Sequence, residues 1–257
     1  MIISVNGKFV DHIELTGDEP EFDYGFGVFE TIRTYNGKLF HLTQHLKRLQ
    51  QSAEIMNFEL PHAIEKIEGW ANAHTKSNSD LRLKIIAAPK NIYILSRPLR
   101  IKNSIYQNGI SMKLYQLERF MPAVKKLNYW QEIQANAIAK KAKCYDALLI
   151  NSKQEITEGA FSNIFYIKND VVITPRNNIL QGITRNIVLQ LARQHYQVKE
   201  KKVLLDELLL ADECFLTQTT TGIVPVVKID KRTIRNGKPG LITADLISKF
   251  ETYTQNI

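Results

Sequence analysis

The sequence predicts an α+β protein with two subdomains, and three observations support this. Two Asn-Gly pairs, Asn6-Gly7 and Asn36-Gly37, each separate short strand-like runs, which is the strongest short hairpin signal. Apolar residues then recur at positions 42, 46, 49, 53 and 56, which is helical spacing. Hairpins and helices follow one another without regular βαβ alternation, which favours α+β over a parallel α/β sheet. A chain of 257 residues suits one large domain or two moderate ones.

The first hundred residues are predicted to form one α+β unit of a common domain size. Two hairpins are followed by two helices, and Pro61 is well placed for the first turn of the second helix. Two further strands flank a tight Pro-Lys-Asn turn. In chain order we expect strands at 2–5 and 8–10, a segment 25–33 leading into a hairpin over 32–40, helices at 42–58 and 60–73, and strands at 81–88 and 92–98.

A polar stretch then predicts a boundary between subdomains. We expect a small domain over 1–103, a linker at 104–108 and a larger domain over 109–257. The larger domain again mixes strands with amphipathic helices, and it shows no internal repeat. Its expected strands are 110–117, 146–151, 164–167, 171–174, 213–217 and 224–229, and its expected helices are 132–143, 183–195, 206–211 and 243–254.

Composition and charge exclude several classes of protein. The net charge is +8, but the basic residues are scattered rather than gathered in a stripe, so we expect no nucleic-acid partner. No apolar run approaches the roughly 20 residues that span a bilayer, and the N-terminus lacks the pattern of a signal peptide. We therefore expect a cytoplasmic protein that does not enter a membrane. Cys144 and Cys214 cannot form a disulfide framework and are expected to be buried thiols.

The common catalytic motifs are missing from this sequence. It has no glycine-rich phosphate loop and no GxSxG nucleophile elbow. His41 and His45 are four residues apart on a predicted helix and could share a metal ion. No glutamate follows His41 as in HExxH, so a structural or surface role is favoured and we expect no metal site.

What remains is a dispersed set of candidate residues. The segment 182–185 precedes a helix and could bind an anion, although Thr184 as a simple N-cap is the favoured alternative. The segment 217–222 is rich in hydroxyl groups and could cradle a phosphate or form a polar turn. Arg48 lies in an amphipathic helix, and Glu158 is expected in a loop, where a carboxylate is usually solvated. Each signal is weak when it is taken alone.

Taken together and in order, these segments resemble the fold-type IV pyridoxal-phosphate enzymes. That family comprises branched-chain aminotransferases, D-amino-acid aminotransferases and aminodeoxychorismate lyases. The resemblance covers nearly the whole chain, and it implies a small α/β domain followed by a larger pseudo-barrel domain. The matching blocks are DYGFGVFETIR (23–33), HLTQHLKRL (41–49), VKKLNY (124–129), TEGAFSNIF (157–165), LQGITR (180–185), ADE (211–213) and TQTTTGIVPV (217–226).

The resemblance implies pyridoxal 5′-phosphate as cofactor and gives roles to individual residues. The family's Schiff-base lysine opens a K-x-L-N block, which assigns the internal aldimine to Lys125. If this stretch is extended, Lys126 points to the opposite face. Glu158 would pair with the pyridine nitrogen, and Arg48 would bind the phosphate as a charge-assisted fork. The remaining cofactor-binding candidates are Leu180, Gly182, Ile183, Thr184, Thr219 and Thr220.

The substrate pocket is less well defined by the resemblance. Tyr24, Phe29 and Tyr129 are the aromatic candidates, and each could instead be ordinary core packing. Thr220 is a further substrate-binding candidate. A substrate carboxylate could be bound by a cation on the strands of the small domain, where the candidates are Arg82 and Arg97, with Lys84 and Lys90 as alternatives.

Two reactions remain open from the sequence. Transamination between an amino acid, or an amine, and a 2-oxo acid is favoured, because the segment 219–226 resembles the aminotransferases. Aminodeoxychorismate lyase, which forms 4-aminobenzoate and pyruvate, is the alternative, because Thr31 follows Glu30 as in the lyases. The preferred enantiomer is not predicted. The resemblance also implies a homodimer.

Overall fold

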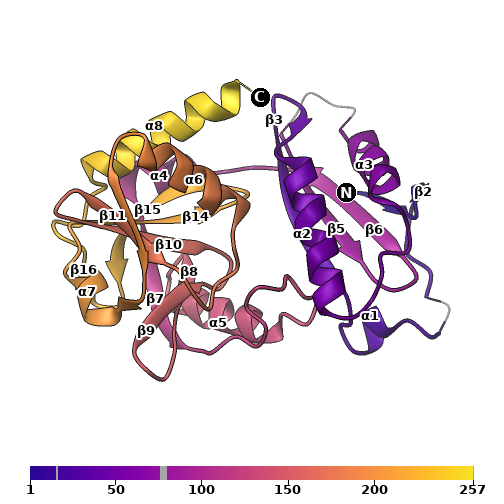
Figure 1. Cartoon of the computed structure of the whole chain (residues 1–257), viewed down its shortest axis with the longest axis horizontal. Helices are drawn as coiled ribbons and strands as arrows, with labels where there is room; N and C mark the ends of the chain where they lie inside the picture. The colour runs from indigo at the N-terminus through magenta and orange to yellow at the C-terminus, as the bar shows by residue number, and fades with distance from the viewer. Residues whose placement is uncertain (16, 76–79, 257) are drawn as a thin grey trace. The chain divides into compact units, whose positions relative to one another are not determined.

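A computed structural model describes residues 1–15, 17–75 and 80–256, and it divides into two compact units (Figure 1). The first unit contains Met1–Arg100, Val124–Tyr129 and Thr254–Ile257. The second contains Ile101–Ala123 and Trp130–Tyr253. The short segment that carries Lys125 therefore belongs to the first unit, although it follows the beginning of the second along the chain.

The first unit is built on a six-stranded sheet in the order β2-β1-β6-β5-β3-β4, in which every neighbouring pair is antiparallel. Both predicted hairpins are confirmed. Asn6 and Gly7 have φ values of 47° and 80°, and Asn36 and Gly37 have 50° and 76°, which suit a type I′ turn. The strands are β1 (Ile2–Val5), β2 (Lys8–Val10), β3 (Val28–Tyr35), β4 (Lys38–Leu39), β5 (Leu81–Ala87) and β6 (Ile92–Pro98).

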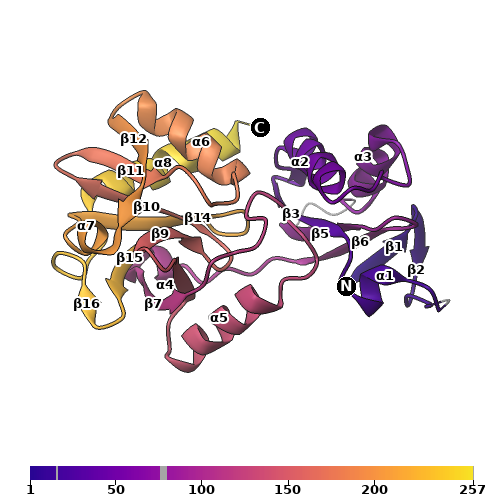
Figure 2. The ribbon, with the colours of Figure 1, turned by 60° about the horizontal axis from the view of Figure 1, so that its bottom comes forward.

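Helices cover one face of this sheet. Helices α2 (Leu42–Ile55) and α3 (Ile64–Ala73) lie over that face, α2 against β3 and α3 against β6 (Figure 2). The short helix α1 (Pro20–Asp23) instead contacts the other face, where the Phe22 ring packs edge-on against Tyr93. Because side chains alternate along a strand, residues of β3, β5 and β6 divide cleanly between the two faces.

The segment 125–127 pairs with the start of β3 and so adds to the edge of the sheet. The Phe29 N–H donates to the Lys125 carbonyl at 2.8 Å, and the Leu127 N–H donates to the Gly27 carbonyl at 2.8 Å. Val28 and Lys126 form an antiparallel bridge between these bonds. The backbone pairing fixes the direction in which each of the two neighbouring lysines points.

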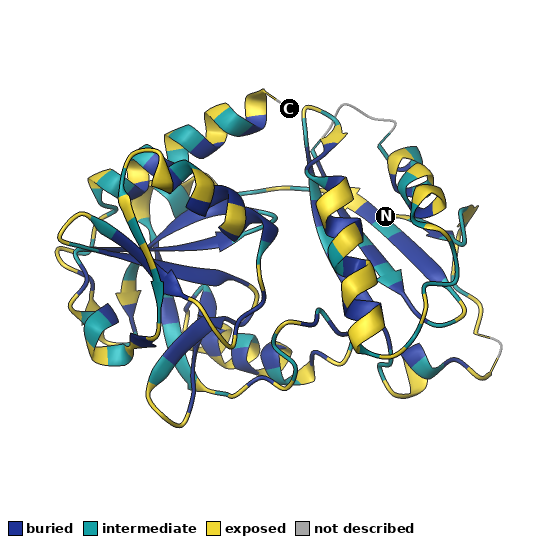
Figure 3. Ribbon diagram, in the orientation of Figure 1, coloured by how far each residue is buried: buried dark blue, intermediate teal, exposed yellow. Residues whose placement is uncertain are grey.

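The second unit is built on one large mixed sheet in the order β12-β11-β10-β14-β15-β7-β8-β9-β13, with β16 paired to β15. Strands β8, β10 and β14 are almost wholly buried (Figure 3). Strand β9 also contacts β10 and β11, so the sheet curves back on itself as a pseudo-barrel would. The strands are β7 (Ile110–Gln116), β8 (Asp146–Ile150), β9 (Glu155–Gly159), β10 (Asn163–Lys168), β11 (Val171–Pro175), β12 (Gln197–Lys201), β13 (Val203–Leu204), β14 (Glu213–Gln218), β15 (Gly222–Ile229) and β16 (Arg232–Thr233).

Five helices pack around this second sheet. Helix α5 lies against β7 and β8, α4 against β15, and α6 against β12 and β14. No helix in the described ranges is long and apolar enough to cross a membrane. The helices are α4 (Ser104–Asn108), α5 (Trp130–Lys141), α6 (Ile183–Arg193), α7 (Leu205–Leu209) and α8 (Leu241–Gln255).

Several expected elements differ in the structure. Helix α3 begins at Ile64, so Pro61 precedes it instead of opening it. The expected linker 104–108 forms α4, and its Ile105 and Tyr106 pack against the apolar core of the second unit. Strand β9 was expected as a loop, because Glu158 and Gly159 are poor strand formers. Strand β12 was missed because its charged residues carry no apolar alternation.

Candidate active site

Lys125 and Lys126 point to opposite faces of the extended sheet, as the sequence predicted for an extended stretch. Lys126 is paired directly with Val28, so it shares the face of Val28 that α2 covers, and only 8% of its surface is exposed. Lys125 lies on the opposite face, where its Nζ is 4.5 Å from the centre of the Phe29 ring. The two lysines therefore occupy different environments despite being neighbours.

The Phe29 ring is the centre of a small cluster on the Lys125 face. Tyr129 packs edge-on against it, with the ring centres 5.6 Å apart. The Nζ of Lys84, from β5, lies 4.6 Å from the same ring centre. Two amines therefore share one aromatic ring, which is a favourable place for an ammonium group. Phe29 and Tyr129, both predicted pocket residues, are brought to Lys125.

Three cations of β5 and β6 gather on this face of the sheet. Arg82 of β5 is paired across the strands with Arg97 of β6, and Lys84 lies two residues further along β5. Burial, followed by the charges of Arg82 and Arg97, lowers the pKa of Lys84. Burial, followed by Arg97, lowers the pKa of Arg82, whose Nε is buried without a hydrogen-bond partner. An anion bound here would offset this repulsion.

On the opposite face, Arg48 is held in a buried cluster of charged groups. Its Nε donates to Glu30 at 2.6 Å and its Nη2 donates to the other carboxylate oxygen at 2.8 Å. The Nδ1 of His45, one turn earlier in α2, lies 2.7 Å from Glu30. Burial lowers the pKa of His45, and because an ionised carboxylate can only accept, the Nδ1–H of His45 donates to Glu30. His45 is thus committed to Glu30 rather than to a metal shared with His41.

We expect the Glu30 cluster to make the protein sensitive to acid. Burial would raise the pKa of Glu30, but Arg48 and His45 hold it well below its usual range. Because the pKa of Glu30 is lower in the folded than in the unfolded protein, its ionised form stabilises the fold at pH values above the unfolded pKa of about 4.3. This stabilisation is lost as the pH falls below that value. The difference in unfolding free energy between wild type and Glu30→Gln should therefore shrink below about pH 4. Denaturant titrations from pH 7 to pH 3 measure it, and a difference that stays constant would contradict this assignment.

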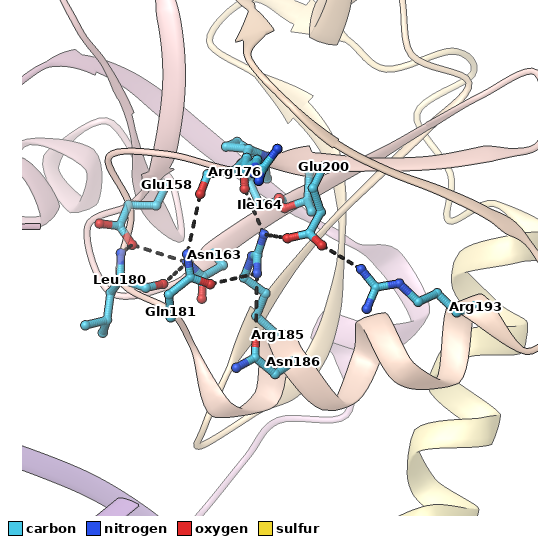
Figure 4. A network of polar contacts seen from close by, with 12 residues as sticks. Glu158, Asn163, Ile164, Arg176, Leu180, Gln181, Arg185, Asn186, Arg193 and Glu200 are labelled. Carbon is cyan, nitrogen blue, oxygen red and sulfur yellow. Dashed lines mark hydrogen bonds and ion pairs between the residues drawn. The ribbon is translucent and has the colours of Figure 1, made fainter. Parts of the chain in front are cut away.

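In the second unit, Glu158 is fixed through both carboxylate oxygens. It lies on β9 and is 3% exposed, so the expected solvated loop carboxylate is wrong. Its Oε1 accepts from Arg119. Its Oε2 accepts from the Leu180 N–H at 3.0 Å and from the Asn163 amide at 3.3 Å (Figure 4). A buried carboxylate held by this many donors stays ionised and keeps one orientation.

Asn163 joins Glu158 to the N-terminus of α6. Its side-chain amide also donates to the Leu180 carbonyl at 2.9 Å. Gly182 packs so tightly against the Asn163 side chain that an added Cβ would lie 2.1 Å from Oδ1. Gly182 is the N-cap of α6, so Thr184 lies inside the first turn and is not the N-cap. The N–H groups of that turn form a natural site for a phosphate.

The threonine-rich segment forms the turn between β14 and β15. Asn163 lies opposite Thr217 in the sheet, so the turn at 219–221 begins two residues beyond that pair. The Thr221 hydroxyl donates to Gln218 at 3.1 Å, which closes the turn. The structure thus brings Glu158, Leu180 and Gly182 together around Asn163, and it places Thr219 and Thr220 at the end of the neighbouring strand.

Comparisons with known proteins identify the family of this chain. The sequence profile of the family described as "Amino-transferase class IV" matches residues 27–229. A Methanocaldococcus jannaschii protein assigned as a branched-chain-amino-acid aminotransferase is 36% identical over 98% of this chain and 96% of its own length. The chain belongs to the class IV aminotransferases. D-alanine aminotransferase of Bacillus licheniformis is 31% identical over 96% of this chain and 94% of its own.

The fold of this class IV aminotransferase matches solved structures over its full length. The crystal structure assigned as a branched-chain amino acid aminotransferase from Thermotoga maritima superposes with a TM-score of 0.91 at 30% identity, covering 100% of this chain and 96% of the other. The enzyme is a pyridoxal-phosphate-dependent transaminase acting between amino acids and 2-oxo acids. These relatives do not favour the lyase alternative.

The residues present in this class IV aminotransferase fit its cofactor. A fixed, buried carboxylate suits a protonated ring nitrogen, and the N-terminus of α6 suits a phosphate. Two residues that were predicted as substrate-pocket candidates lie at exposed positions. Tyr24 is 78% exposed, and Lys90 pairs with Asp18 at 3.4 Å on the surface. Sequence reasoning gave no role to Arg119 or Asn163, although Asn163 lies within a matching block.

Proposed function

We propose that Lys125 is the lysine that bonds pyridoxal phosphate and moves the proton during transamination. The observation that carries this proposal is its placement, with Nζ 4.5 Å from the Phe29 ring on the face that bears three further cations. The neutral form of a lysine amine is the nucleophile that bonds an aldehyde. Lys126 lies on the covered face and is 8% exposed.

The same amine then serves as the general base and acid. When bound, the cofactor supplies an aldehyde that bonds amines and a ring that accepts the electron pair released at the substrate Cα. The Lys125 amine removes the Cα proton and later returns a proton to complete transfer of the amino group. The Phe29 and Tyr129 rings lie beside the Lys125 amine, and their apolar surface limits its access to water.

The cationic group of Arg82, Lys84 and Arg97 is proposed to bind the carboxylate of the substrate. All three lie on the Lys125 face, and the lowered pKa values of Arg82 and Lys84, which result from burial and neighbouring cations, indicate a site short of negative charge. A guanidinium fork matches a carboxylate geometrically. Amino acids and 2-oxo acids both carry this group, so the same site serves both half-reactions.

Contacts to the cofactor are proposed for each unit by itself. Glu158 pairs with the ring nitrogen. The backbone N–H of Leu180 already donates to the Glu158 carboxylate, so the Leu180 side chain is proposed to pack on the cofactor ring. In the first unit, Arg48, oriented by Glu30, is proposed to bind phosphate. In the second unit, the amides of Gly182 and Ile183 are proposed to do so. The hydroxyls of Thr184, Thr219 and Thr220 complete the phosphate site.

A donor screen tests the proposed function. Purified enzyme with pyridoxal phosphate and 2-oxoglutarate should form glutamate from at least one of L-leucine, L-valine, D-alanine and (R)-phenylethylamine. The first two donors follow the branched-chain relatives and the third the D-alanine relative. Lack of transfer from all four, combined with pyruvate release from aminodeoxychorismate, would contradict the proposal and assign lyase activity.

We further propose a cytoplasmic homodimer. The two free cysteines, Cys144 and Cys214, are buried, which suits a reducing compartment. The family resemblance supports the dimer, which sedimentation of the holoenzyme checks directly.

A further inference from the structure

Arg119 lies between two buried carboxylates of the second unit. Its Nε donates to Glu132 of α5 at 2.7 Å, and its Nη1 donates to Glu158 of β9. The three side chains are 3%, 1% and 4% exposed. Arg119 lies in the segment between β7 and α5, six residues before Lys125, and sequence reasoning gave it no role.

We infer that Arg119 is a positioning residue that keeps the shared proton on the ring nitrogen of the cofactor. A guanidinium on Oε1 stabilises the ionised form of Glu158, so the proton between Glu158 and the ring stays on nitrogen. Leu180 and Asn163 hold Oε2, so Arg119 sets the charge while they set the plane of the carboxylate. Glu132 anchors Arg119 from the other side. This inference rests on the proposed pairing of Glu158 with the ring.

The test follows the protonation of the ring nitrogen in the holoenzyme loaded with pyridoxal phosphate labelled with ¹⁵N in the ring. In wild type the ¹⁵N resonance should lie at the protonated position at pH 7.5. In Arg119→Met it should move toward the neutral-pyridine position, and kcat should fall about 10- to 100-fold, by analogy with the loss of outer-shell partners of metal ligands. Arg119→Lys keeps the charge but cannot fork between two carboxylates, so its resonance should move in the same direction by less.

Glu132→Gln is the matched control, because it breaks the same buried network at the end away from Glu158. It should lower the melting temperature while the ¹⁵N resonance stays at the protonated position. A wild-type resonance in folded Arg119→Met or Arg119→Lys would overturn the inference, as would an equal displacement in Glu132→Gln. Glu158→Gln separates the two proposals: if it leaves the resonance unmoved, the pairing of Glu158 with the ring fails; if it moves the resonance and Arg119→Met does not, only the inference fails.

Discussion

Replacing Lys125 by alanine should abolish transamination. The variant loses both the amine that bonds the cofactor and the base that moves the Cα proton, so kcat should fall by at least about 1000-fold. Steady-state rates with the best donor of the screen measure this loss. Because Lys125 is partly exposed and paired through its backbone, the variant should fold with a melting temperature close to that of wild type.

Lys126→Met is the control for this substitution. Its side chain is buried on the face covered by α2, so the change should lower the melting temperature while kcat stays within about threefold of wild type, because no catalytic step uses this amine. A Lys126→Met enzyme as inactive as Lys125→Ala would show that the two roles were assigned the wrong way round.

Replacing Arg48 by methionine should both destabilise the first unit and weaken cofactor binding. The change leaves the fully buried Glu30 carboxylate with His45 but without its bidentate partner, and breaking a buried pair costs about 3–5 kcal/mol. Denaturant unfolding of the protein without cofactor measures the stability term. Titration of the protein with pyridoxal phosphate measures the loss of cofactor affinity, which is expected because Arg48 is proposed to bind the phosphate.

Two further variants separate these effects. Arg33→Met removes a less buried pair from the same sheet, in which Arg33 is 13% and Asp80 42% exposed, and it should cost less than Arg48→Met. Combining Arg48→Met with Glu30→Gln should cost less than the sum of the two single changes, because the buried charge is then gone. Strict additivity would contradict the description of Glu30 and Arg48 as one buried pair.

Turn sequences and the alternation of side chains along a strand correctly predicted the features of the fold that depend on neighbouring residues. Both Asn-Gly turns formed as expected, because positive φ values at Asn and Gly select the hairpin. The alternation of Lys125 and Lys126 also followed from extended backbone. The strand that carries Glu158 was missed, because the pairing of β9 with β8 and β13 overrides the weak strand preference of its own residues.

The buried charge networks could not be predicted from the sequence. Arg48 is 18 residues from Glu30, and Arg119 is 39 residues from Glu158, so no spacing rule connects them. The matching blocks identified Arg48 and Glu158, but they did not reveal which groups hold these residues in place. Arg119 lies outside every block, and only the folded chain shows that it contacts two carboxylates.

The central claim is that Lys125, rather than its neighbour, bonds the cofactor. Borohydride reduction of the holoenzyme fixes pyridoxal phosphate to the lysine that holds it, and peptide mass mapping then identifies that residue. The structure predicts one modified site, at Lys125, with Lys126 unmodified. Label on Lys126, or on Lys84 across the Phe29 ring, would contradict it.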